Sequence, residues 1–238
     1  MSETRPNILV LMTDQHSKHV LGAYGNSIVR TPNLDWLAAE GIRFTNCYCP
    51  APLCIPCRSS FMTTRTPTQN RVWENSHLLD SSIPTWAHHL GAAGYETSLI
   101  GRMHFSGADQ WHGFEHRRIG EWQSRYPGSP VPLGAPYKKY AQGTLGQSRT
   151  AVVKAGYGTT TFQWADQQVA NCACDYLEEK ANGKDERPFA AVSSIWLPHC
   201  PFIAPKDLFE YYYNRVDLPE VEAEQPETVT RFRRHRDI

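Results

Sequence analysis

The sequence has no excess charge of either sign and no long hydrophobic run. Its 24 lysine and arginine residues balance 24 aspartate and glutamate residues, so no net charge attracts the chain to nucleic acid or to an anionic membrane. The longest apolar stretch, residues 8–12, is far shorter than the roughly 20 residues that span a bilayer. The first residues lack the basic and apolar regions of a secretory signal. These absences predict a cytoplasmic protein without a membrane or nucleic-acid partner.

Cysteine is sparse as well. Seven cysteines in 238 residues are too few for a disulfide scaffold, so we expect mostly free thiols. With 40% hydrophobic and 20% charged residues, the chain has the composition of an ordinary globular protein. Its one shift in composition, at residues 124–146, indicates an irregular excursion over about residues 111–163 rather than a linker between domains.

Short apolar runs alternate with helical patterns along most of the chain. Residues 7–12 form an apolar run followed by Thr13-Asp14-Gln15-His16, which predicts a buried strand with polar side chains at its carboxyl end. Ligand sites of open α/β sheets lie at that edge. Further strands are expected at residues 42–49, 95–101 and 189–196, and helices at residues 31–41, 84–94 and 164–180. The alternation predicts an α/β fold with a mostly parallel central sheet flanked by helices.

The densest chemical signal begins at Cys54. Residues 57–64 contain no proline or glycine, so a helix that starts near Pro56 would place Arg58 one turn from Cys54, on the same side. A helix N-terminus beside a guanidinium group is a ready site for an oxyanion. The segment therefore predicts an anion site next to a sulfur atom.

Other interpretations of these cysteines stay open at this point. Cys54 and Cys57 have the spacing of a redox pair or of half a zinc site, and Cys47 and Cys49 are nearby. A zinc site needs a second ligand pair, and a thioredoxin-like pair needs a small βαβ unit; neither is evident in the sequence. The third alternative is ordinary buried cysteines.

The pattern Cys54-x-Pro-x-Arg58, followed by Met62-Thr63, resembles the signature of the formylglycine-dependent sulfatases. That family has serine or alanine where this chain has Cys57. In the family the cysteine is oxidised after translation to an aldehyde, whose hydrate is the nucleophile. The resemblance implies that Cys54, rather than Cys57, is modified by a formylglycine-generating enzyme.

Other segments resemble the family in the same order. Residues 6–15 are similar to its opening strand, and Asp14-Gln15 matches the choline sulfatase and phosphonate monoester hydrolase branch rather than the sulfatases with two consecutive aspartates. Further blocks that resemble the family are residues 31–46, 101–115 and 197–205. The resemblance implies an alkaline-phosphatase-like sandwich.

The resemblance also implies roles for individual residues. The metal ligands would be Asp14, Gln15 and the modified Cys54. Arg58 would hold the aldehyde hydrate, while His104 and His199 would contact the sulfate or protonate the leaving oxygen. Asn75 and Arg102 would contact the substrate, with Arg102 in the place of a usual lysine. Hard oxygen ligands favour Ca²⁺, with Mg²⁺ or Mn²⁺ as alternatives.

One part of the family pattern is missing. Family members complete the metal site with an aspartate followed by histidine or asparagine, beyond the block at 197–205, and no aspartate of this chain is followed by either. We therefore expect residues 1–238 to be the N-terminal part of a sulfatase catalytic domain whose C-terminal part is absent, either a fragment or a chain completed by another. Because Ca²⁺ takes about 6 to 8 oxygen ligands, the chain alone should bind metal weakly and turn over slowly.

These observations predict a hydrolase of small sulfate esters that uses formylglycine and a divalent cation. The alternatives are a phosphonate monoester or phosphodiester hydrolase, or an inactive fragment that binds anions. His112 and His116 are expected to be ordinary surface or core histidines, and the basic run at residues 231–236 a solvated face. A homo-oligomer stays open.

Overall fold

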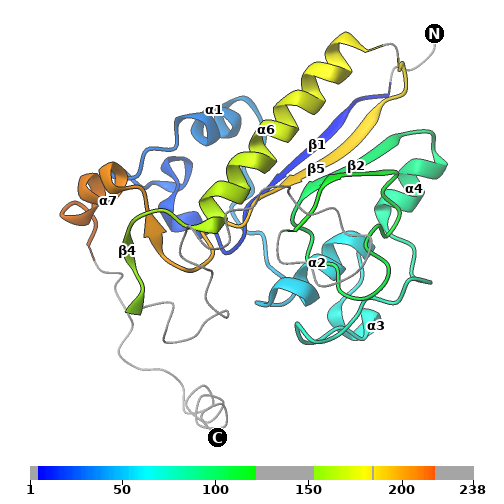
Figure 1. Cartoon of the computed structure of the whole chain (residues 1–238), viewed down its shortest axis with the longest axis horizontal. Helices are drawn as coiled ribbons and strands as arrows, with labels where there is room; N and C mark the ends of the chain where they lie inside the picture. The colour runs from blue at the N-terminus through cyan, green and yellow to red at the C-terminus, as the bar shows by residue number, and fades with distance from the viewer. Residues whose placement is uncertain (1–4, 122–152, 184, 218–238) are drawn as a thin grey trace, which may run out of the picture.

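The computed structural model describes residues 5–121, 153–183 and 185–217. Its main sheet consists of parallel strands in the order β1 (Ile8–Met12), β5 (Phe189–Ser194), β2 (Glu96–Gly101) and β3 (His116–Ile119). β5 lies between β1 and β2, although it follows both in the sequence (Figure 1). The predicted parallel α/β sheet is confirmed.

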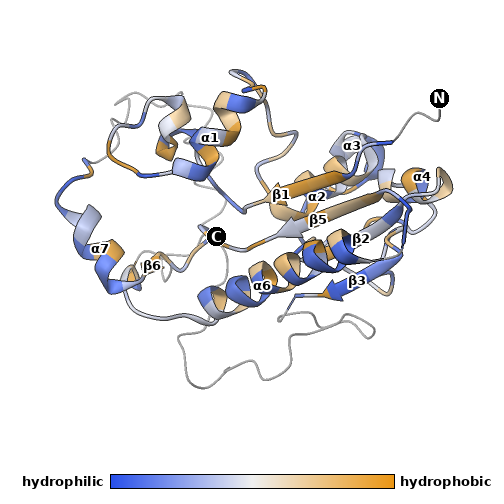
Figure 2. Ribbon diagram, turned by 90° about the horizontal axis from the view of Figure 1, so that it is seen from above, coloured by the Kyte–Doolittle hydropathy of each residue, from blue (hydrophilic) through white to orange (hydrophobic). Residues whose placement is uncertain are grey.

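Helices cover both faces of this sheet. α6 (Thr161–Asn182) runs along one face, and α2 (Cys54–Thr63) and α4 (Trp86–Ala92) lie on the other (Figure 1, Figure 2). The remaining helices are α1 (Pro32–Glu40), α3 (Pro67–Asn70) and α7 (Lys206–Tyr213), with 3-10 turns at Lys18–Val20 and Gly22–Tyr24. A second, two-stranded parallel sheet pairs β4 (Gly156–Tyr157) with β6 (Ile203–Ala204).

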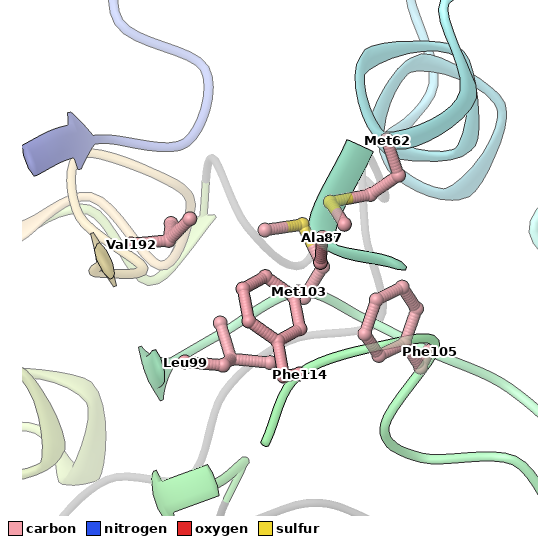
Figure 3. Close-up of a cluster of buried hydrophobic side chains, with 7 residues drawn as sticks. All are labelled: Met62, Ala87, Leu99, Met103, Phe105, Phe114 and Val192. Carbon is pink, nitrogen blue, oxygen red and sulfur yellow. The ribbon is translucent and has the colours of Figure 1, made fainter. Parts of the chain in front are cut away.

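Successive residues of the central strands supply two hydrophobic cores. Leu99 of β2 and Val192 of β5 face α2 and α4, and their neighbours Ile100 and Ala191 face α6. This alternation follows from the two-residue period of a strand. The first core also contains Met62, Ala87, Met103, Phe105 and Phe114 (Figure 3). The second also contains Val169, Ala173, Tyr176 and Phe189.

β1 is well covered on one face only. Val10 packs against the core beneath α2 and α4, whereas Leu9 and Leu11 are 39% and 63% exposed. α6 packs on β2, β3 and β5, so apolar side chains on its side of β1 stay open to solvent. A strand with this apolar pattern is built to be covered on both faces.

Most of the predicted elements are present in the structure, with two corrections. The strand predicted at residues 42–49 is wrong: the segment is neither helix nor strand, and Ile42 and Tyr48 are 84% and 86% exposed. The excursion predicted at residues 111–163 is also too long, because residues 116–119 form β3 and pair with β2. Residues 122–152 and 231–236 lie outside the described part of the chain.

The described helices can be compared with the length and hydropathy that a membrane-spanning helix needs. Within the described ranges, none of them is long and apolar enough to cross a bilayer.

The uneven cover of the sheet predicts unequal costs for the same substitution on two strands. Leu99→Ala should lower the free energy of unfolding by about 2 to 5 kcal/mol, because it opens a cavity in a fully buried core. Leu11→Ala should lower it by less than about 1 kcal/mol, because the side chain is mostly exposed already. Urea titrations of both variants check this. Equal losses would contradict the half-open sheet.

Candidate active site

The carboxyl ends of three parallel strands bring the predicted site residues together. Met12 at the end of β1 is in register with Ser194 at the end of β5, and Ser194 is in register with Gly101 at the end of β2. Asp14 follows β1 and Arg102 follows β2, while the chain beyond β5 reaches His199. The strand register therefore explains why residues far apart in sequence share one edge of the sheet.

The turn after β2 requires glycine. Gly101 has a φ of +92°, and an added Cβ would lie 2.2 Å from the backbone oxygen of Ser194. That oxygen accepts a hydrogen bond of 2.8 Å from the Arg102 amide. The close approach of the two backbones brings Arg102 to the edge of β5.

α2 supplies Cys54 and Arg58. The helix begins at Cys54, two residues before the predicted start near Pro56, which lies in the first turn, where its missing N–H removes no helical bond. The side-chain oxygen of Asn75 accepts a hydrogen bond of 2.9 Å from the amide of Ile55, a free N–H of that first turn. The side chain of Asn75 thus holds the N-terminus of α2.

Asp14 is the centre of the charged cluster and is buried. Its Oδ2 lies 2.9 Å from Nη2 of Arg58 and 3.1 Å from Nη1 of Arg102, and its Oδ1 lies 4.0 Å from Sγ of Cys54. Burial by itself would raise the pKa of Asp14, but the two guanidinium groups outweigh it and hold that pKa below its usual value. Asp14 is therefore ionised at neutral pH, with one oxygen toward the arginines and the other toward Cys54.

Arg58 is fixed by several partners. Its Nη1 donates to the backbone oxygen of Arg102 at 2.8 Å and to Oγ of Ser194 at 3.1 Å, while Nη2 donates to Asp14. Because these partners come from β5 and from the turns after β1 and β2, Arg58 connects α2 to the sheet. A guanidinium group with this many bonds keeps one orientation.

The thiol of Cys54 has a lowered pKa. Burial alone would raise this pKa, but a hydrogen bond with His104 and the charge of Arg102 outweigh it. A lowered pKa increases the thiolate fraction, which is the reactive form.

The two site histidines hold their ring protons differently. Nη2 of Arg102 lies 2.8 Å from Nδ1 of His104, and because arginine only donates, a neutral His104 carries its proton on Nε2. Nδ1 of His199 lies 2.7 Å from the backbone oxygen of Cys200, and because a carbonyl only accepts, a neutral His199 carries its proton on Nδ1. Nε2 is thus a donor in His104 and an acceptor in His199.

Asp166 supports the segment that carries His199. Its two carboxylate oxygens accept hydrogen bonds of 2.8 Å each from the amides of Trp196 and Leu197. Burial raises the pKa of Asp166 to about 6, since it outweighs the effect of these bonds. The sequence gives no signal for Asp166, which lies in the second turn of α6 and belongs to no motif.

A possible metal site lies within this cluster. Ligand atoms of Asp14, Cys54 and His199 are all within 4.8 Å of one another. Asp14 and Cys54 were predicted as ligands, whereas His199 was predicted as a catalytic residue. Gln15, the third predicted ligand, has a φ of +62° and lines a pocket together with Asp14 and Cys54. The donors fit a divalent cation in kind, but Asp14 is the only carboxylate in the group.

A pocket of about 480 Å³ opens beside these residues. Asp14, Gln15, Cys54 and Arg58 line it together with Met12, Thr13, Cys49, Ala51, Pro52, Leu53, Cys57 and Phe61.

His112 is buried against the ring of Phe105, and His116 is half exposed. His116 thus has the surface position expected of it, whereas His112 is not the satisfied core histidine expected: neither ring nitrogen is hydrogen bonded, although Nδ1 lies 3.3 Å from a carboxylate oxygen of Asp109.

A second depression of about 720 Å³ lies at the opposite end of the sheet, beside Asn7 and Phe189. Three of its charged side chains are held in ion pairs: Lys180 with Glu96 and Asp185, and Arg187 with Asp185.

The seven cysteines are all thiols, as the sequence analysis predicts for most of them. Sγ of Cys57 lies 3.3 Å from Sγ of Cys49, while the sulfur of Cys54 faces Asp14. Burial and the neighbouring thiol of Cys49 raise the pKa of Cys57 to about 12. Cys54 and Cys57 therefore have different partners, and the described residues place no second pair of zinc ligands beside them.

The fold and the site together define a class: α/β proteins that gather arginines, histidines and metal-ligating groups at the carboxyl edge of a parallel sheet. Residues 6–231 match the model of the family named Sulfatase. The chain belongs to the Sulfatase family.

Individual relatives agree with this assignment. The choline-sulfatase of Rhizobium meliloti (strain 1021) is 36% identical over 237 residues, which cover 94% of this chain and 44% of the relative. The uncharacterized sulfatase YidJ of Escherichia coli (strain K12) is 32% identical, over 87% of this chain and 41% of the relative. The chain thus spans less than half the length of each of these relatives.

Solved structures share the fold. The phosphonate monoester hydrolase of Silicibacter pomeroyi superposes with a TM-score of 0.68 at 19% identity, over 92% of this chain and 47% of that one. BT4656, solved with its substrate D-glucosamine-2-N,6-O-disulfate, gives a TM-score of 0.63 at 24% identity, over 91% of this chain and 39% of that one. The sheet and its helices therefore have the alkaline-phosphatase-like arrangement of the sulfatases.

Removing the central carboxylate should destabilise the fold. Asp14→Asn leaves two buried guanidinium groups without their negative partner, so the free energy of unfolding should fall by about 3 to 5 kcal/mol. Asp185→Asn, which removes an exposed carboxylate of a surface ion pair, should change stability far less. Urea titrations without divalent cations compare the two variants. A stable Asp14→Asn protein would contradict the central place of Asp14.

Asp166 should make stability depend on pH. Its pKa is 3.8 ordinarily and about 6 in the folded chain, so the folded state binds the extra proton between these values. Its contribution to stability is complete below pH 3.8 and is lost as pH rises through 6, by at most about 1.4 kcal/mol per pH unit. Asp166→Asn should remove this decline. Urea titrations at several pH values give the free energy of unfolding of the parent chain and of Asp166→Asn. If this free energy changes with pH by the same amount in both proteins, the role of Asp166 is disproved.

Proposed function

We propose that the chain carries the nucleophile and the oxyanion-binding part of a sulfate ester hydrolase. The observation that carries the proposal is the cluster itself: ligand atoms of Asp14, Cys54 and His199 lie within 4.8 Å of one another, with Arg58 and Arg102 against the same carboxylate. Two fixed positive charges beside a reactive side chain are what an anionic ester requires. The name of the choline-sulfatase relative supports a sulfate ester as the substrate class.

The proposed nucleophile comes from Cys54. We infer that a formylglycine-generating enzyme converts this cysteine to formylglycine during maturation. When present, the hydrated aldehyde would supply the attacking oxygen, and a divalent cation would acidify that hydroxyl and offset the charge of the ester. Ca²⁺ suits the carboxylate oxygen of Asp14, with Mg²⁺ or Mn²⁺ as alternatives.

The surrounding side chains have complementary tasks. Arg58, held on several sides, orients the group at position 54 through the carboxylate of Asp14. Arg102, which lies 3.1 Å from the same Asp14 oxygen as Arg58, and its partner His104 would bind the ester oxygens. Because the proton of neutral His104 is on Nε2, that atom can donate to the leaving oxygen.

His199 has the complementary arrangement. Its Nδ1 proton goes to the carbonyl of Cys200, so Nε2 is free to accept a proton or to bind a metal. At the start of the reaction His104 would therefore donate a proton through Nε2, and His199 would accept a proton or bind a metal through Nε2. We propose Asn75 as a positioning residue for α2 in addition to the predicted substrate contact.

Two alternatives have observations in their favour. The order Asp14-Gln15 resembles the phosphonate monoester hydrolase branch, which supports phosphonate monoesters or phosphodiesters as substrates. The single carboxylate among the possible metal ligands supports a chain that binds anions but turns over slowly by itself. We propose residues 1–238 as the N-terminal part of a sulfatase catalytic domain on the same ground. A cytoplasmic location and a homo-oligomer stay predictions.

Modification of Cys54 provides the first test. The chain is expressed together with a formylglycine-generating enzyme and labelled with an aldehyde-reactive hydrazide, and the peptide across residue 54 is analysed by mass spectrometry. We expect labelling of the parent chain and of Cys47→Ser, which changes an exposed cysteine outside the pocket, and none of Cys54→Ala. An intact thiol at residue 54, in cells that modify a reference sulfatase, would refute the proposed nucleophile.

Substrate class and completeness are tested on chain expressed together with the formylglycine-generating enzyme and left unlabelled, so that the aldehyde at residue 54 stays free. With Ca²⁺ present, an aryl sulfate should be hydrolysed faster than an aryl phosphonate ester, and Cys54→Ala should reduce both rates to background. The rate of the isolated chain should be low and should rise with Ca²⁺ concentration without saturating early, because the ligand set is small. A faster phosphonate reaction would favour the alternative substrate, and full turnover would contradict the weak metal site.

A further inference from the structure

Besides Cys54, two further cysteines line the pocket, and their sulfur atoms have no part in the proposed reaction. Sγ of Cys49 is 3.3 Å from Sγ of Cys57. Cys49 belongs to the segment between α1 and α2 and is exposed, whereas Cys57 belongs to α2 and is half buried. Both line the same pocket as Cys54.

The geometry of this pair is close to that of a disulfide. The two sulfurs are in contact, and a bond of about 2.05 Å needs them to approach by little more than an ångström. Cys57 is anchored in a helix, but Cys49 lies in a segment without helix or strand, so Cys49 can make this movement. The thiol of Cys49 donates to the carbonyl of Ala51 at 2.7 Å, which is the one bond that the movement would disturb.

Cys54 has different surroundings. Its sulfur lies 4.0 Å from a carboxylate oxygen of Asp14 and is hydrogen bonded with His104. It is, however, three residues before Cys57 on the same helix, and side chains at that spacing are neighbours. Without Cys49, the thiol nearest to Cys57 along the helix would be that of Cys54.

We propose that Cys49 and Cys57 form a redox-active pair that closes to a disulfide with small-molecule disulfides such as oxidised glutathione, and that this pairing leaves Cys54 as a thiol. The chemistry of the pair does not depend on the proposed function. It bears on that function because Cys54 can be converted to formylglycine only while its sulfur is not in a disulfide.

The exchange balances in two steps. The thiolate of the exposed Cys49 attacks one sulfur of oxidised glutathione, forms a mixed disulfide and releases one glutathione thiolate. The sulfur of Cys57, having lost its proton to solvent, attacks the Cys49 sulfur and releases the second glutathione thiolate. Two protein thiols are oxidised to one disulfide, and one disulfide is reduced to two thiols.

The experiment uses the full chain, reduced and then exposed to excess oxidised glutathione. Free thiols are blocked with iodoacetamide, and the denatured protein is cut with trypsin and chymotrypsin. Cleavage after Tyr48, Leu53 and Arg58 separates residues 49–53 from residues 54–58. We expect these two peptides to be joined by a disulfide, with fragment spectra that locate the iodoacetamide label on Cys54.

Variants separate the two parts of the proposal. Cys47→Ser, a matched change of an exposed cysteine two residues away, should keep the joined peptides. Cys49→Ser should lose them and gain a bond between Cys54 and Cys57, with at least a tenfold loss of the label on Cys54. Measured on unfolded protein, none of these readouts depends on activity.

Three results would overturn the proposal. The first is a disulfide that includes Cys54 in the parent chain. The second is full labelling of both Cys49 and Cys57 while the exposed Cys174 carries glutathione, which would show that the oxidant acted elsewhere. The third is unchanged labelling of Cys54 in Cys49→Ser, which would remove the protective role.

Discussion

The carboxylate of Asp14, held between the guanidinium groups of Arg58 and Arg102, is the interaction on which the rest of the site depends. It joins the ends of β1 and β2 to α2 through contacts of 2.9 and 3.1 Å, and Arg58 extends the connection to Ser194 on β5. Buried charges of this kind are stable only together, because each would be costly to bury alone. The same arrangement leaves one oxygen of Asp14 toward Cys54, where a cation and a nucleophile would have to meet.

Around this centre, backbone and side-chain contacts decide what each ring nitrogen can do. Arg102 donates a hydrogen bond to Nδ1 of His104, so the proton of neutral His104 is on Nε2. The carbonyl of Cys200 accepts a hydrogen bond from Nδ1 of His199, so the proton of neutral His199 is on Nδ1. Asp166 contributes at a distance, since it fixes the backbone before His199 without touching the pocket. Asp166 and the carbonyl of Cys200 thus prepare the site although neither is proposed to contact the substrate.

Two further features of the chain are an uncovered face of β1 and a possible metal site with few carboxylates. Leu9 and Leu11 on β1 are exposed although their strand has the apolar pattern of a buried one, and the possible metal site has a single carboxylate. Both features accompany a chain that spans less than half the length of its choline-sulfatase relative. The single carboxylate explains why we expect the anion site to be better formed than the metal site.

Local patterns in the sequence were sufficient for β1, β2 and β5, the main helices and the signature around Cys54, because each depends on neighbours a few residues apart. Tertiary structure alone decided that β5 enters the sheet between β1 and β2, that residues 42–49 find no strand to pair with, and that Asn75 caps α2. It also decided that Cys57 faces Cys49 rather than Cys54. These contacts join segments whose order in space depends on the whole sheet, and no periodicity along the chain encodes that order.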